Sequence, residues 1–91
     1  MYAGRRLFTV EDTFLIEGQG LALAPGIVPE GDENFQSGDP IELRVPSGDI
    51  TRTHIASLQL PTPNPKHQVV VMLPKEFGKE DVPIGTEVWS S

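Results

Sequence analysis

Cysteine is absent from this sequence, which excludes disulfide bonds, thiol nucleophiles and thiolate metal ligands. Long apolar runs are absent too. No stretch approaches the ~20 residues of a membrane-spanning helix, and no apolar segment follows the paired arginines near the N-terminus as it would in a secretory signal. We therefore expect a cytoplasmic protein that does not enter the membrane. The length of 91 residues suits one domain, over residues 1–91, with a modest core.

Basic residues are few: seven lysines and arginines stand against 13 aspartates and glutamates, and the formal net charge is −6. This balance argues against non-specific nucleic-acid binding, in which basic side chains displace counterions from phosphates. It is most simply a contribution to solubility. A local basic patch stays open as an alternative, because six residues could gather on one side: Arg5, Arg6, Arg44, Arg52, Lys75 and Lys79.

Glycine and proline, nine of each, interrupt the chain at short intervals. Such spacing forbids long helices and favours short strands joined by turns. Apolar runs predict strands over residues 9–16, 21–28, 41–45, 50–60, 69–73 and 84–89, and the only helical turn expected lies within residues 76–82. Pro25 and Gly26 predict a bulge or a barrel corner inside the second of these strands.

Alternation in the first strand assigns Val10, Phe14 and Ile16 to the core face. Residues 29–40 are polar and acidic and predict a loop, in which Phe35 folds back as a hydrophobic plug. Residues 61–66, PTPNPK, predict an extended connector, because their three prolines remove three amide donors.

These elements predict an all-β domain of six or seven antiparallel strands with no helix to cover a sheet face. A chain of this kind can bury one face and hide its strand edges by closing its sheet on itself. We therefore expect a small closed β-barrel.

Three stretches together resemble the second-domain barrel of translational GTPases such as elongation factor Tu. They are VEDTFLIEGQG at 10–20, SGDPIEL at 37–43, and VVVML at 69–73 followed by KEDVPIGTEV at 79–88. The matches run in the family's order over nearly the whole chain. The resemblance implies a closed Greek-key barrel of six to seven strands, the translation-protein type, standing alone as one domain.

The Gly18-Gln19-Gly20 triplet is a strand-to-strand turn in that family, not a nucleotide loop. A dinucleotide fingerprint needs a third glycine at the position of Leu23, where a helix would begin. Two departures affect function: Gln19 replaces the family's usual basic residue, and no GxxxxGK[ST] motif of a GTPase occurs. Contact with aminoacylated tRNA, the family's use of this barrel, is therefore only an open alternative.

No catalytic or metal-binding pattern stands out. His54 and His67 could join Asp39 or Asp49 around a metal, but ligands at helical or hairpin spacing are missing and surface histidines are the simpler interpretation. The acidic run at 30–33 lacks the twelve-residue ladder of a calcium loop. We expect no cofactor and no metal. For Trp89 we favour core packing over presentation to a partner.

The sequence therefore predicts a non-catalytic binding module that contacts a protein, or alternatively RNA, rather than an enzyme. Two alternatives remain: a structural protein that assembles with itself, and a small hydrolase with carboxylates at a loop rim. The oligomeric state is open. The candidate partner-binding residues are Arg5, Arg6, Arg44 and Arg52.

Overall fold

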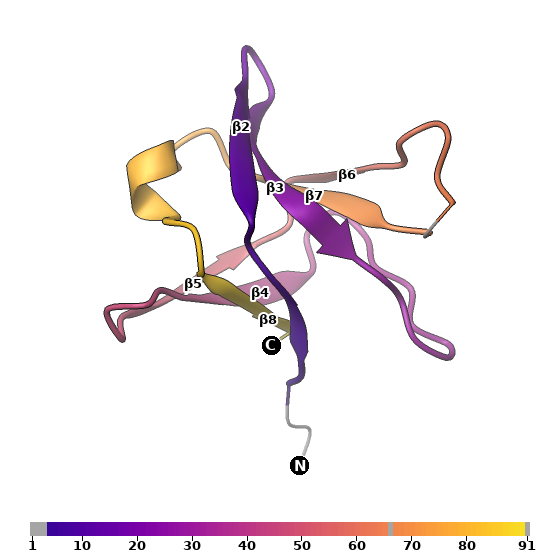
Figure 1. Cartoon of the computed structure of the whole chain (residues 1–91), viewed down its shortest axis with the longest axis horizontal. Coiled ribbons are helices and arrows are strands. Elements are labelled where there is room, and N and C mark those ends of the chain that lie inside the picture. The colour runs from indigo at the N-terminus through magenta and orange to yellow at the C-terminus, as the bar shows by residue number, and fades with distance from the viewer. Residues whose placement is uncertain (1–3, 66, 91) are drawn as a thin grey trace.

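Eight short strands and one 3-10 turn form the regular structure of residues 4–65 and 67–90, the part of the chain that the computed structural model describes (Figure 1). They are, in chain order, β1 (Arg6–Thr9), β2 (Asp12–Ile16), β3 (Gly20–Ile27), β4 (Pro40–Arg44), β5 (Ile50–His54), β6 (Ser57–Gln59), β7 (Val69–Leu73), η1 (Lys79–Asp81) and β8 (Glu87–Ser90). The predicted all-β class is confirmed. Among these residues, no helix has the length and apolar character needed to span a membrane.

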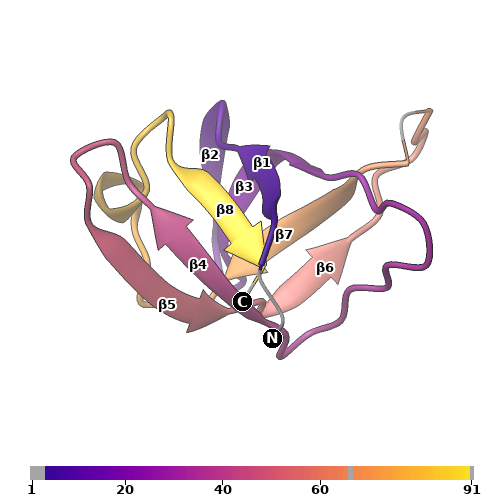
Figure 2. The same ribbon diagram turned by 90° about the horizontal axis from the view of Figure 1, so that it is seen from below.

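The strands form two antiparallel four-stranded sheets, in the orders β1-β8-β4-β5 and β2-β3-β7-β6 (Figure 2). Neither sheet closes on itself, so the predicted closed Greek-key barrel is wrong. The prediction assumed that a chain without helices must close one sheet to bury a face. Here the two sheets instead bury their inner faces in one shared core, as in two-sheet packings.

Two of the connections between the sheets are sharp corners, at which consecutive residues bond in or beside strands of different sheets. Val10 N donates to Thr86 O at 2.8 Å on the β8 side, and the next residue, Glu11, donates to Ala24 O at 2.9 Å on the β3 side. The backbone of this segment thus changes from bonding beside β8 to bonding with β3 within two residues, and this change makes a corner between the two sheets.

The second corner divides the predicted strand at 50–60 into β5 and β6. Ile55 N donates to Asp39 O at 2.9 Å, and Ala56 N donates to Met72 O at 2.9 Å. A period-two apolar pattern continues through such a bend, so the pattern alone does not locate it.

The core draws on both sheets. Its fully buried side chains include Leu21, Leu23, Ile41, Leu43, Ile55, Val71, Leu73 and Val88. Phe35 packs against this core from the loop, as predicted.

Phe14 and Ile16 were predicted to be inward, but they are exposed, at 51% and 36% of their surface. Thr13 is buried in their place. The corner at residues 10–11 changes the phase of the alternation, so that Val10 and Phe14 no longer share a face.

The two predicted turn features of β3 are confirmed. Gly18 and Gly20 lie at the turn that joins β2 to β3, both with positive φ, at 79° and 124°. The register of β3 against β7 shifts between Leu23 and Ile27, where the bulge was expected. Gly26, within this shift, has a φ of 113°.

Candidate partner-binding face

One row of four residues crosses the whole β1-β8-β4-β5 sheet. Arg6 of β1 pairs with Trp89 of β8, Trp89 pairs with Glu42 of β4, and Glu42 pairs with Arg52 of β5. The residues before and after Glu42, Ile41 and Leu43, are buried. Because side chains alternate along a strand, the row therefore lies on the outward face of the sheet.

Arg44 and Glu87 pair with each other two positions along β4 and β8, on the same face. We call the six residues of this surface the arginine–tryptophan face: Arg6, Glu42, Arg44, Arg52, Glu87 and Trp89. Three arginines against two glutamates leave it one net positive charge, in a chain whose formal charge is −6.

The two glutamates orient the arginines. The Glu42 carboxylate lies 3.4 Å from Arg44 Nε and 3.6 Å from Arg52 Nε, and Glu87 lies 3.7 Å from Arg6 Nη1. Exposed pairs of this length contribute about 0–1 kcal/mol each. The arginine side chains remain 58%, 42% and 79% exposed for residues 6, 44 and 52. They are therefore held in place but accessible.

Trp89 lies on this face and not in the core, so the expected core packing is wrong. Its indole Nε1 donates to Glu87 Oε1 at 2.9 Å, and the Arg44 guanidinium carbon lies 4.0 Å from the ring centroid. Val88 is the buried residue of this strand. The stacked guanidinium is attracted by the ring, which fixes both groups on the sheet surface.

Arg5, the fourth predicted arginine, has a different role. Its Nε and Nη2 donate to the two carboxylate oxygens of Glu33 at 2.7 Å and 2.5 Å. Hydrogen bonds from Arg5, and one from the backbone N–H of Glu30, lower the pKa of Glu33 to about 2. This bidentate ion pair links the loop before β4 to the start of β1.

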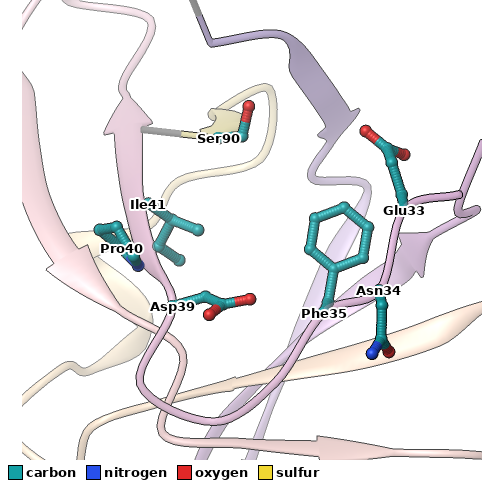
Figure 3. A pocket seen from close by; sticks show the side chains of 7 residues that line it. All are labelled: Glu33, Asn34, Phe35, Asp39, Pro40, Ile41 and Ser90. Atoms are coloured by element: carbon teal, nitrogen blue, oxygen red, sulfur yellow. The ribbon is translucent and has the colours of Figure 1, made fainter. Parts of the chain in front are cut away.

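A hollow of about 430 Å³ opens beside this loop. Its lining consists of Glu33, Asn34, Phe35, Asp39, Pro40, Ile41 and Ser90. Figure 3 shows Asp39 and Ile41 on one side of the hollow and Phe35 on the other. Both carboxylates already have local partners, because Glu33 binds Arg5 and Asp39 accepts from Gln36 N at 3.0 Å.

The two histidines belong to different parts of the fold. His54 lies in β5, and His67 directly follows the connector at 61–66, with a φ of 53°. Within residues 4–65 and 67–90, no three His, Asp or Glu side chains come together in a way that could hold a metal ion.

Of the four arginines predicted to bind a partner, Arg6, Arg44 and Arg52 lie on the arginine–tryptophan face, whereas Arg5 binds Glu33. The prediction did not include Glu42 or Glu87, and it favoured the core for Trp89. The available signal was the alternation Glu87-Val88-Trp89 and Glu42-Leu43-Arg44, which places the polar residues and the indole on one face. Comparisons with models of known protein families, with curated proteins and with solved structures found no match.

Proposed function

We propose that this chain is a non-catalytic binding module of the cytoplasm that holds a partner protein on the arginine–tryptophan face. The observation that carries the proposal is the row Arg6, Trp89, Glu42 and Arg52 across all four strands of one sheet. Tryptophan and arginine dominate the binding energy at many protein interfaces. Paired strands hold these side chains in fixed relative positions, so that little ordering is needed when a partner binds.

The two glutamates favour protein over RNA as the partner. Glu42 lies between Arg44 and Arg52, and Glu87 lies beside Arg6. A phosphate backbone laid along the row would meet a carboxylate next to each guanidinium. A protein surface can instead offer separate carboxylate, amide and apolar groups to the separate sites, which gives electrostatic complementarity without that repulsion.

The sequence likeness to the second domain of elongation factor Tu supports a binding role. In that family the domain serves contacts with other macromolecules, and the chemistry belongs to a separate GTPase domain. The likeness concerns residues 10–20, 37–43, 69–73 and 79–88.

The test is a pull-down from lysate of the source cells with three baits. They are the wild-type chain, the double variant Arg44→Ala/Arg52→Ala, and the control Lys75→Ala, which removes a charge from an exposed turn. We expect one protein whose affinity falls about 30- to 1,000-fold in the double variant, because each of the two interface arginines is worth about 1–2 kcal/mol. The control should bind like the wild type.

Three results would overturn the proposal. The double variant could retain every partner of the wild type. The recovered species could be RNA, lost on nuclease treatment. The bait could recover only untagged copies of itself, which would indicate self-assembly.

A further inference from the structure

β5 is an edge strand whose outer backbone groups have no partner among the described residues. Val45 N donates to Asp49 O at 3.0 Å, and Ile55 exchanges hydrogen bonds with Gly38 and Asp39, just before β4. The odd-numbered residues of β5 therefore direct their main-chain groups toward β4. In an antiparallel strand the direction alternates from residue to residue. The N–H and C=O groups of Ile50, Arg52 and His54 therefore point away from the sheet.

Two of the other edges are capped by side chains. On β1, Arg5 Nη1 donates to Arg6 O at 3.0 Å. On β2, Lys79 Nζ donates to Thr13 O at 2.8 Å, while Thr13 N donates to the Asp12 carboxylate at 2.8 Å. Caps of this kind prevent pairing with another chain.

The remaining edge, β6, has three residues, whereas β5 has five. β5 is thus the longest edge in the described residues without such a cap.

The side chains of β5 determine which charge is favoured in a further strand that pairs with its outer edge. Arg52 is 79% exposed, and it is the only lysine, arginine, aspartate or glutamate in β5. A strand added next to β5 would place its side chains about 4.5–5.5 Å from those of β5, where opposite charges stabilise and like charges destabilise the pair. An acidic strand fits this edge.

A second copy of this chain does not fit the same edge. Antiparallel pairing of β5 with itself about its centre would set Arg52 against Arg52. Like charges directly opposite each other destabilise a strand pair.

We propose that the β5 edge receives an extended acidic segment of another protein, which adds to the β1-β8-β4-β5 sheet as a fifth strand. Main-chain hydrogen bonds to Ile50, Arg52 and His54 supply affinity, and a carboxylate of the segment meets Arg52. The inference rests on the proposed function, because Arg52 belongs to the arginine–tryptophan face, and it adds the chemical class and geometry of the partner.

The experiment titrates the ¹⁵N-labelled chain with a soluble eight-residue peptide that alternates valine and glutamate. Amide hydrogen exchange is measured residue by residue. We expect exchange to slow about tenfold or more at the outward amides of Ile50, Arg52 and His54, since they gain acceptors. The amides of Thr51 and Thr53, already bonded to β4, should change little.

Two control peptides separate the contributions. The same peptide with lysine in place of glutamate tests the charge, and the acidic peptide N-methylated at alternate amides tests the main-chain hydrogen bonds. Neither should slow exchange at β5. The variant Arg52→Thr keeps a good strand former and should bind the acidic peptide about tenfold more weakly.

The outcomes distinguish the two proposals. A protein partner lost from the Arg44→Ala/Arg52→Ala bait, with no slowing at the outward amides of β5, would leave the proposed function standing and overturn strand addition. Equal slowing by the acidic and the lysine peptides would overturn the acidic class. Oligouridylate that shifts Trp89 resonances, together with no protection of β5 by the acidic peptide, would overturn both proposals.

Discussion

Arg5 and Glu33 join the start of β1 to the acidic loop, and the pair offers a direct test of what stabilises that loop. Both side chains are 29% exposed, and the two carboxylate oxygens each accept one hydrogen bond from the guanidinium. The substitution Glu33→Gln removes the charge with little change in volume. We expect it to destabilise the protein at neutral pH and to have little effect in strong acid.

The magnitude follows from the pKa of Glu33, which lies at about 2 instead of the ordinary 4.5. At face value the gap corresponds to about 3 kcal/mol of stability. Water and salt screen a partly exposed pair, and we expect about 1 kcal/mol to remain. For a domain of this size that loss lowers Tm by about 4–8 °C.

The direction of the pKa shift determines the pH range over which Glu33 stabilises the protein. The pKa of Glu33 is lower in the folded state, so the stabilisation is complete above about pH 4.5 and is lost as the pH falls through about 2. Urea denaturation followed by circular dichroism at pH 7, 4.5, 3.5 and 2.5 measures it. The difference between wild type and Glu33→Gln should shrink over this range. The control Glu30→Gln changes a side chain that is 72% exposed and 3.7 Å from Arg5. A difference that stays constant with pH, or an equal loss in the control, would refute the reasoning.

Two further substitutions test the fold by urea denaturation. Gly20→Ala would bring a methyl group into overlap with the Leu73 carbonyl oxygen, so we expect a loss of 3 kcal/mol or more, or failure to fold; Gly18→Ala, with open space around it, should cost about 1–2 kcal/mol for its positive φ alone. Equal losses would contradict the close approach of the two strands. Thr86→Val removes a buried hydroxyl that donates to a main-chain carbonyl at 2.6 Å, and should cost about 1–2 kcal/mol, against less than about 0.5 for the exposed Thr51→Val.

The parts of the fold that the sequence predicts correctly are local. Ile41 and Leu43 alternate with charged residues and form a half-buried strand, because a single buried face imposes period two. Residues 69–73 are apolar on both faces and form β7, which lies between β3 and β6. Neither result depends on a distant partner.

The corners could not be predicted in the same way. The bend at residues 10–11 exists because Val10 and Glu11 bond to different neighbours, Thr86 and Ala24, which are far apart in the chain. Without those pairings, the pattern favours one long strand and puts Phe14 in the core. The barrel prediction failed for the same reason.

The candidate site also has a part that the local sequence predicts and a part that depends on distant strand pairing. The turn at 46–49 indicates a hairpin between the strands that carry Arg44 and Arg52, so their proximity is accessible from the sequence. The position of Arg6 beside Trp89 is not, because it depends on pairing between the two ends of the chain.

That pairing also constrains how the protein can form during synthesis. β1 is the first strand of the domain to be made, and its partner β8 is the last. Until β8 is made, Leu7 and Phe8, which are buried in the folded structure, have no neighbouring strand with which β1 can pair. The β2-β3 hairpin, by contrast, can form as soon as its own residues emerge. We expect the sheet that bears the arginines to assemble only after β8 has emerged, with β1 open to chaperones in the interval.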